Sequence, residues 1–293
     1  MLYDIGLTIT HEYASSASAG RHALRLMPAD LPGEQRLIAG TLDIKPTPDE
    51  WLNGMDFFGN PVVDIAYRSA HDEIVFSIHA RVERMARTPS LNLSPALAGL
   101  RQEVTAYRAL DPLSPHHFLG ASPRVPLDDD ITAYARALLT EGMTATDAVA
   151  AVGLALHRDM RFDPEATTVD TPTKEAFERR HGVCQDFTHI MIAALRGIGV
   201  PAGYVSGYLR TKPPEGKPRL EGADAMHAWV RAWCGFETGW IEYDPTNALL
   251  VGTDHIVIAR GRDYADVAPV KGVLRTAGDQ TADHAVDVIP LSA

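Results

Sequence analysis

The first 88 residues alternate between apolar and polar positions in the way that is typical of half-buried β-strands. Every second residue from Tyr3 to Ile9 is apolar, and the same period of two returns between Ile74 and Val82. Between these runs, the stretch DFFGNPVVDIAYRS places a Gly-Asn-Pro turn between two strand-like segments. Several short strands separated by turns predict an antiparallel β-sandwich domain over residues 1–88.

Helix signals replace this pattern in the second half of the chain. Three acidic residues precede ITAYARALLTEG, and Pro172 stands at the first helical position of TPTKEAFERRHG. Thr144 has Asp147 three residues later, which resembles a capping box at the start of TATDAVAAVGLALHRDM. A further helix is predicted from about Cys184, because apolar residues follow it at helical spacing. Strand-like runs then return in AGYVSGYL, HAWVRAWC, GWIEYDP and HIVIARG, so the second half is predicted to be an α+β domain.

A proline-rich stretch separates the two patterns. Six prolines interrupt residues 89–126, and no period is sustained there apart from a partly helical region around Ala96 to Leu110. We therefore divide the chain into a β domain over residues 1–88, a connecting segment over 89–126 and an α+β domain over 127–293. The run from Thr211 to Gly222 is rich in proline, glycine and charge, which predicts a mobile surface loop.

Composition narrows the classes of function. The chain has 293 residues, of which 45% are hydrophobic and 22% are charged, as in an ordinary globular protein. Its net charge of −11 argues against a nucleic-acid partner, because phosphate binding requires concentrated Lys and Arg. No apolar run approaches the roughly 20 residues of a membrane span, and the N-terminus lacks the features of a signal peptide. Two cysteines cannot form a disulfide framework, so we expect a cytoplasmic, reducing setting. We also expect no membrane partner, no cofactor and no metal.

The candidate nucleophile is one of these two cysteines, Cys184 in HGVCQDFTHI. It lies at the predicted start of a helix, where unpaired N–H groups and the helix dipole favour an anionic thiolate. The same N–H groups can stabilise an oxyanion. On position alone, a buried cysteine that packs as a small apolar residue is an equal alternative, so the assignment depends on whether a base stands nearby.

A base and an acid to orient it are available on two strands that follow. His227 opens the strand-like run HAWVRAW, and Asp244 ends the run GWIEYD. The segment GFETG between the runs has two glycines, which predicts a tight turn and hence a β-hairpin. Both residues then occupy the open, solvent-facing end of the hairpin, where Asp244 can hold one imidazole nitrogen while the other faces the thiol. Cys184, His227 and Asp244 are therefore the predicted catalytic residues.

Three stretches carry a resemblance to the transglutaminase-like superfamily, which has a papain-like core: GVCQDFTHIMIAALRGIGVPAGYVSGY, MHAWVRAW and GWIEYDPTN. The N-terminal run with RHALRLMP and DFFGNPVVDIAYRS resembles the β domain that precedes this core in bacterial members. The resemblance covers almost the whole chain and implies helices packed on an antiparallel sheet, preceded by a β-sandwich. It also implies acyl transfer through a thioester, since the family includes transglutaminases, peptide hydrolases, amide-cleaving deglycosylation enzymes and members that have lost catalysis.

We therefore expect a cysteine hydrolase that cleaves amide or peptide bonds in a protein or peptide substrate. A cross-linking transglutaminase is an alternative, because the two activities differ only in whether an amine or water resolves the thioester. A non-catalytic binding module on the same fold is a second alternative, although such a module has no chemical reason to keep all three residue types.

Other reactive residues are expected to have structural roles. Cys234 precedes the hairpin turn, far from its open end, and is predicted to have a structural or surface role. Asp186 is predicted to cap the helix of Cys184, and His189 to be an ordinary packed or exposed helix residue. A zinc site formed by Cys184, His189 and His227 is the chemical alternative to the triad, but it leaves the acidic partner unused.

Three more groups stand out along the chain. Trp229 and Trp233 share one face of a predicted strand and should pack in the core. The polar cluster from Arg262 to Asp266 is predicted to be an ion-paired corner rather than a catalytic group. His116 and His117 lie in the proline-rich segment and are predicted to be polar loop residues.

Overall fold

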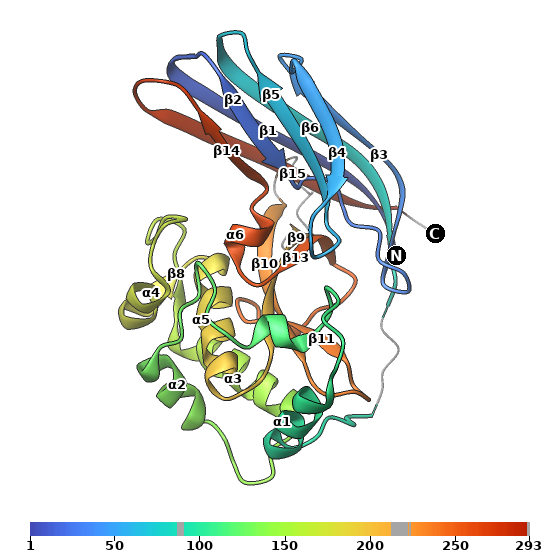
Figure 1. Ribbon diagram of the computed structural model, residues 1–293, viewed down its shortest axis with the longest axis vertical. Coiled ribbons are helices and arrows are strands. Elements are labelled where there is room, and N and C mark those ends of the chain that lie inside the picture. Colours follow the sequence, from blue (N-terminus) through green and yellow to red (C-terminus); the bar gives the residue numbers. More distant parts are fainter. Residues whose placement is uncertain (87–90, 212–221, 223, 292–293) are drawn as a thin grey trace, which may run out of the picture.

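The computed structural model describes residues 1–86, 91–211, 222 and 224–291. Figure 1 shows two units, a pair of β-sheets drawn largely in blue and a helix-rich unit around another sheet. This is the α+β architecture that the sequence predicts. Most of the predicted loop from Thr211 to Gly222 lies outside the described residues. None of the helices in the described part of the chain combines the length and the apolar character that crossing a membrane requires.

Two antiparallel sheets form the N-terminal unit, with the strand orders β15-β1-β6-β3 and β14-β2-β5-β4. The strands that the first part of the chain contributes are β1 (Leu2–Ala17), β2 (Gly20–Leu24), β3 (Gln35–Lys45), β4 (Glu50–Met55), β5 (Pro61–Tyr67) and β6 (His71–Arg84). Every second residue from Tyr3 to Ile9 is buried, and these residues share one core with Leu24 and Ile65 of the second sheet. The apolar positions of the alternating sequence are therefore buried between the two sheets.

The last two strands of the chain also belong to these sheets. β15 (Gln280–Leu291) pairs antiparallel with β1, and β14 (Val270–Leu274) pairs antiparallel with β2. The predicted α+β range of 127–293 thus includes two strands that the structure places in the N-terminal unit. The physical reason is that local alternation predicts a strand but carries no information about a partner far away in the chain.

An antiparallel sheet in the order β12-β11-β10-β9-β13 forms the centre of the second unit. Its strands are β9 (Ala202–Leu209), β10 (Ala225–Trp233), β11 (Trp240–Asp244), β12 (Leu249–Leu250) and β13 (His255–Gly261). Helix α5 (Cys184–Gly197) packs on β9 and β10 and also contacts α2 (Asp129–Arg136), α3 (Ala145–Asp159) and α4 (Thr173–Arg179). The other elements are α1 (Leu97–Ala106), a short helix at Pro115–Phe118, α6 (Tyr264–Val267), and the parallel pair β7 (Arg161–Phe162) and β8 (His181–Gly182).

Local sequence signals set the helix boundaries. Asp128 caps α2, because its carboxylate accepts the N–H groups of Asp130 and Ile131. Thr144 caps α3 by accepting the N–H of Asp147 at 3.2 Å, and its hydroxyl donates to the Asp147 carboxylate at 2.6 Å. Both predicted helix starts are therefore confirmed.

Side chains of the N-terminal unit form hydrogen bonds with β13, which is the edge strand of the central sheet. The amide of Gln35 on β3 forms two 2.8 Å hydrogen bonds with the backbone of Val257, one in each direction. The amide of Asn60 forms the same pair of bonds, both 2.8 Å, with the backbone of Arg260. These buried amides satisfy backbone groups that an edge strand leaves unpaired, so they join the two units along β13.

Candidate active site

Cys184 is the first residue of α5, as predicted, and it is partly exposed. The carboxylate of Asp186 turns back to accept the N–H of Val183 at 2.8 Å and the hydroxyl of Thr167 at 2.6 Å. Burial raises the pKa of Asp186 against the effect of these hydrogen bonds. A Cβ on Gly182 would lie 2.5 Å from this carboxylate, so the glycine leaves room for the cap. Asp186 thus has the capping role that the sequence predicts.

His227 and Asp244 lie on the two strands of the predicted hairpin. β10 and β11 pair in a register that sets Val230 opposite Tyr243. Continuing this register by one residue puts Asp244 opposite Trp229, one diagonal step from His227 on the same face. The Nε2 atom of His227 donates to Oδ2 of Asp244 at 2.8 Å.

Cys184 and His227 line the same pocket, and the side chain of Cys184 helps to raise the pKa of His227. Since Nε2 contacts Asp244, Nδ1 is the ring nitrogen that remains for the sulfur. Burial works to lower the pKa of His227, but the hydrogen bond with Asp244 and the interaction with Cys184 outweigh it and raise the pKa to about 10. Burial works to raise the pKa of Asp244, and hydrogen bonds from two histidines hold it well below its usual range. The structure therefore brings the three predicted residues together.

The environment of the pair differs from the prediction. His227 is 8% exposed and Asp244 is 0% exposed, whereas the hairpin by itself indicates an open, solvent-facing end. The reason is that α5 and β15 both pack against β10, so the end of the hairpin is covered. A hairpin recognised from its turn does not reveal what will pack on it.

A second histidine contacts the same carboxylate and was not predicted. His255 opens β13, and its Nε2 atom lies 3.0 Å from Oδ2 of Asp244. Asp244 also accepts the side-chain amide of Asn247 at 2.7 Å and the backbone N–H of Thr246 at 2.9 Å. The Nδ1 atom of His255 is buried without a hydrogen-bond partner. Nε2 is therefore the ring nitrogen of His255 that can donate to the carboxylate.

The curvature of the central sheet brings His255 to Asp244. β10 and β9 stand between β11 and β13 in the strand order, yet Asp244 of β11 contacts His255 of β13. A second bridge joins the same two strands, since Glu242 of β11 forms an ion pair with Arg260 of β13 at 2.5 Å. The sequence offers one weak signal, a histidine at the start of a strand-like run, and no indication of its partner.

The same side chains define where a metal ion could be held. One nitrogen each from His227 and His255 and one oxygen of Asp244 lie within 4.8 Å of one another. Both nitrogens lie at hydrogen-bond distance from the carboxylate, so the arrangement is that of two hydrogen-bonded imidazoles. Among the described residues, the zinc set of Cys184, His189 and His227 does not form such a group. A ring nitrogen of His189 instead accepts a backbone N–H at 3.2 Å.

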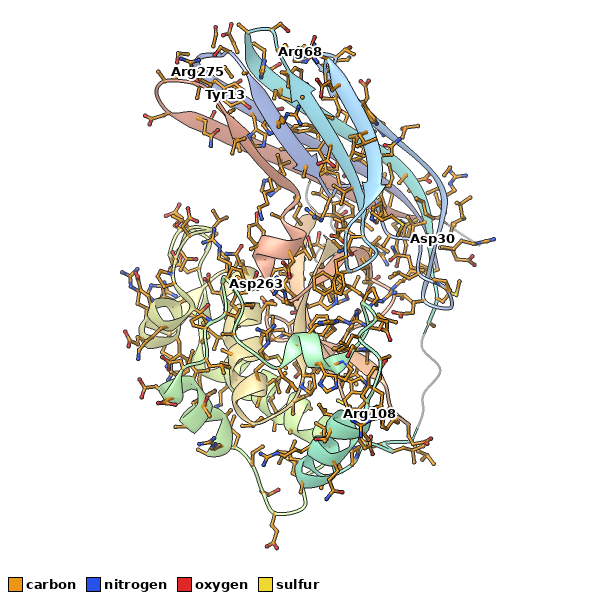
Figure 2. The ribbon with its side chains drawn as sticks, in the orientation of Figure 1. Tyr13, Asp30, Arg68, Arg108, Asp263 and Arg275 are labelled. Atoms are coloured by element: carbon orange, nitrogen blue, oxygen red, sulfur yellow. The ribbon has the colours of Figure 1, made fainter. Side chains whose placement is uncertain are left out.

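The remaining reactive residues have structural surroundings. Cys234 is buried, and burial raises its pKa to about 12. The indole of Trp229 is buried and donates to Glu242 at 2.9 Å. Arg262 and Asp266 form an ion pair at 2.8 Å. Asp263, which Figure 2 labels, accepts the N–H of Ala265 at the start of α6. These contacts agree with the structural roles that the sequence indicates.

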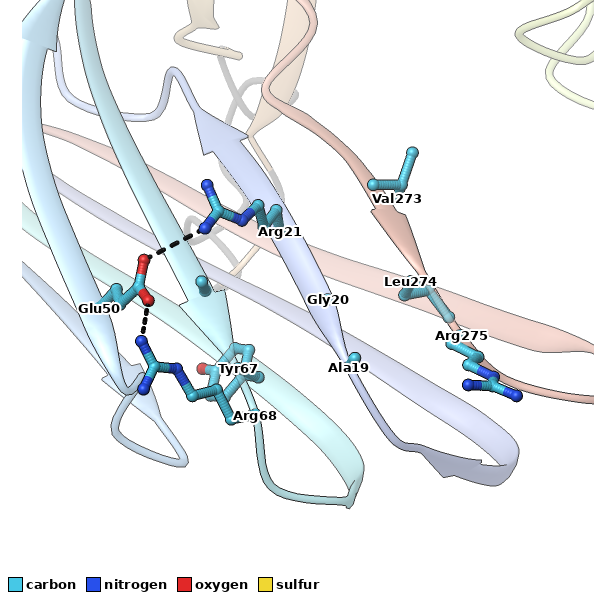
Figure 3. Close-up of a pocket in the computed structure, with 10 residues that line it drawn as sticks. Ala19, Gly20, Arg21, Glu50, Tyr67, Arg68, Val273, Leu274 and Arg275 are labelled. Atoms are coloured by element: carbon cyan, nitrogen blue, oxygen red, sulfur yellow. Dashed lines mark hydrogen bonds and ion pairs between the residues drawn. The ribbon is translucent and has the colours of Figure 1, made fainter.

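Cys184 and His227 line a pocket of about 360 Å³. A different cavity lies on the sheet of β14, β2, β5 and β4, where Glu50 forms exposed ion pairs with Arg21 and Arg68 (Figure 3). It shares no lining residue with the pocket at Cys184. Exposed ion pairs of this kind contribute little binding or stability, so we assign this second cavity no part in the chemistry.

The sequence also matches the models of two known protein families. The model of the transglutaminase-like superfamily matches residues 132–245, and that of the bacterial transglutaminase-like N-terminal region matches residues 3–83. Cys184, His227 and Asp244 lie inside the first match, whereas His255 lies outside it.

Relatives along the whole chain support this match. An uncharacterised protein of Mycobacterium tuberculosis is 32% identical over 295 residues, which cover 96% of this chain and 88% of the relative. An uncharacterised protein of Mycobacterium leprae is 30% identical over 282 residues, which cover 96% of this chain and 95% of the relative. A crystal structure from Cytophaga hutchinsonii, named "Putative Cysteine Protease", is 21% identical and covers 100% of this chain and 91% of that chain with a TM-score of 0.77. This last likeness shows the fold.

Proposed function

Because the chain belongs to the transglutaminase-like superfamily, we propose that it is a cysteine-dependent acyl-transfer enzyme that hydrolyses amide or peptide bonds. The observation that supports this most directly is the imidazole of His227. It lines the same pocket as the Cys184 thiol and is hydrogen-bonded to the Asp244 carboxylate at 2.8 Å. A thiol, a base and a group that orients the base are the parts that nucleophilic catalysis needs.

In the proposed acylation step, the thiolate of Cys184 attacks the carbonyl carbon of an amide and forms a tetrahedral oxyanion. The first N–H groups of α5 favour negative charge at this point, since a helix N-terminus leaves them without partners inside the helix. The imidazolium of His227 then gives its proton to the leaving nitrogen. The C–N bond breaks, an amine departs, and the acyl group remains on the sulfur as a thioester.

In the proposed deacylation step, His227 removes a proton from water while the water oxygen attacks the thioester carbonyl. The C–S bond breaks, the carboxylic acid leaves, and the thiolate and imidazolium return. Asp244 does not take up the proton. It keeps Nε2 of His227 engaged at 2.8 Å, so that the other nitrogen stays directed at the sulfur.

Turnover of a library of blocked peptides, with and without a primary amine, tests the proposal. Hydrolysis releases free acids, whereas transamidation produces amine adducts that are distinguishable by mass. We expect free acids to dominate, and we expect Cys184→Ala to form neither product while keeping the melting temperature of the parent. Turnover that survives Cys184→Ala would overturn the mechanism. Adducts in excess of acids would identify a transglutaminase, and binding of peptides without either product would identify a binding module.

A further inference from the structure

The pocket beside Cys184 has walls from both units of the fold. The central unit contributes Cys184, His227 and Met226. The N-terminal unit contributes Ile9 of β1 and, from the returning C-terminal strands, Val270 of β14 together with Ala282 of β15. The structural reason is the path of the chain, since β14 and β15 leave the central unit and join the N-terminal sheets next to the thiol.

Charge on the lining restricts what the pocket can accept. Among the described residues that line it, none is Lys or Arg, and Asp283 carries the single carboxylate. The rest of the surface is largely apolar, with Val169, Val183 and Met226 adding to the three apolar side chains of the N-terminal wall. The cation that the lining supplies is the imidazolium of His227, which is already hydrogen-bonded to Asp244 and faces Cys184. An anionic side chain in the pocket would compete with the thiol for this cation, whereas an apolar side chain would gain from burial.

Size and position restrict it further. The pocket volume of about 360 Å³ lies at the lower end of the roughly 300–1,000 Å³ that is usual for small-ligand sites. One or two residues of a peptide fit this volume better than a folded partner does. Cys184 is itself one of the residues that line the pocket. The substrate side chain that fills the pocket therefore belongs to the residue next to the carbonyl that the thiol attacks.

We propose that the N-terminal unit forms the acyl-donor subsite of the enzyme, and that this subsite selects a donor with an apolar side chain beside the reacting amide. The inference rests on the proposed function for the identity of the reaction. The apolar wall of Ile9, Val270 and Ala282 holds the side chain, and the central unit supplies the thiol and the imidazole. The β-sandwich therefore has a role in specificity as well as in stability.

Two thiol-directed inhibitors with the same reactive group test the subsite in the full-length protein. The probes are benzyloxycarbonyl-phenylalanyl and benzyloxycarbonyl-aspartyl chloromethyl ketones, and the readout is the second-order rate of modification at Cys184 by mass spectrometry. We expect the phenylalanyl probe to react at least roughly tenfold faster, which corresponds to burial of one large apolar side chain. Iodoacetamide, which has no side chain to bind, reports the reactivity of the thiol separately.

Ala282→Glu is the variant, and Ala285→Glu is its matched control. Both alanines are exposed residues of β15, but only Ala282 lines the pocket. We expect Ala282→Glu to lower the ratio of phenylalanyl to aspartyl rates at least roughly fivefold, while Ala285→Glu keeps both this ratio and the iodoacetamide rate. Val270→Asp, on the other strand of the wall, should lower the ratio as well.

The possible results test the proposed subsite and the proposed function independently. Equal rates for the two probes on the parent protein, or equal losses in Ala282→Glu and Ala285→Glu, overturn the subsite. A Cys184 that reacts with iodoacetamide no faster than glutathione does argues against the proposed function alone. The ratio of the two ketone rates still reports the subsite in that case, because any accessible thiol reacts with both probes.

Discussion

His227 lies between a sulfur and a carboxylate, and this position determines its charge. Burial disfavours the imidazolium, yet the hydrogen bond with Asp244 and the interaction with Cys184 raise its pKa to about 10 from an ordinary value of 6.5. A raised pKa in the folded state stabilises the fold below about pH 6.5, and this contribution is lost as the pH rises through about 10. At neutral pH the site therefore holds a protonated imidazole beside the thiol.

We expect iodoacetamide to alkylate Cys184 faster than Cys234 at every pH between about 6.5 and 9, because Cys184 is partly exposed at the start of α5 beside the imidazole of His227 whereas Cys234 is buried. Cys234 is the internal control. Its raised pKa of about 12 and its burial keep its rate low, and that rate should climb with pH. Mass spectrometry of both cysteine peptides from one sample gives both rates. Faster labelling of Cys234 than of Cys184 at any of these pH values would contradict the expectation.

His255 is expected to act through Asp244, as a positioning residue. His255→Phe keeps an aromatic ring but removes the N–H that lies 3.0 Å from Oδ2 of the carboxylate. We expect turnover at pH 7 to fall by roughly tenfold, since a hydrogen bond to a charged group contributes about 1.5–3 kcal/mol. The acidic limb of the pH–rate profile should move to higher pH, because Asp244 loses one of the two histidine hydrogen bonds that lower its pKa.

His255→Gln is the control for this prediction, because its amide can still donate to the carboxylate. We expect it to recover part of the lost rate and most of the shift in the pH profile. A His255→Phe protein with lower stability but an unshifted profile would show that the residue supports the fold without influencing the triad.

At the scale of single elements, β11 carries a second buried carboxylate close to Asp244. Glu242 is 4% exposed and pairs with Arg260 at 2.5 Å and with Arg84 at 3.7 Å. Burial works to raise its pKa, but Arg260 and Arg84 lower it to about 2. A lowered pKa in the folded state stabilises the protein above the ordinary value of 4.5. That stabilisation is lost as the pH falls toward about 2.

We therefore expect the melting temperature of the parent protein to fall more steeply between about pH 5 and 2.5 than that of Glu242→Gln. At pH 7 the variant should be less stable by about 1–3 kcal/mol, because Arg260 and Arg84 lose the buried carboxylate but keep Glu34 as a partner. Calorimetry across this pH range measures both effects. Glu50→Gln is the control, since Glu50 forms ion pairs with two arginines on an exposed surface and its loss should leave the pH dependence unchanged. Parallel curves for the parent and Glu242→Gln would refute the expectation.

Elements with local signals could be predicted from the sequence, whereas contacts between distant elements could not. Thr144 caps α3, and two glycines in GFETG set the turn that aligns His227 with Asp244. Both features depend on residues that are close together in the sequence. The contact of His255 with Asp244 depends on how strongly the central sheet curves. Curvature results from packing across the whole unit, and no short stretch of sequence encodes it.

At the scale of the whole molecule, the C-terminal strands β14 and β15 complete the two sheets of the N-terminal unit. Twelve residues of β1, from Leu2 to Tyr13, pair with β15, so the N-terminal unit is incomplete without the end of the chain. The same unit is bonded to β13 through Gln35 and Asn60. A loss of packing in the sandwich should therefore reach the central sheet and the site on it.

This connection predicts that the two units unfold together. Val288 on β15 is 0% exposed, and Val288→Asp buries an unpaired carboxylate in the sandwich core at a cost of at least about 3 kcal/mol. Val273→Asp on β14 is the control, because Val273 is 74% exposed and the same substitution there should cost little. We expect one calorimetric transition in the parent and in both variants, with a lower midpoint for Val288→Asp alone. The near-ultraviolet signal of the buried tryptophans Trp229 and Trp233, both on β10 of the central unit, should disappear at that same midpoint. Two separate transitions in Val288→Asp, with this tryptophan signal retained through the first, would show instead that the sandwich and the catalytic unit are energetically independent.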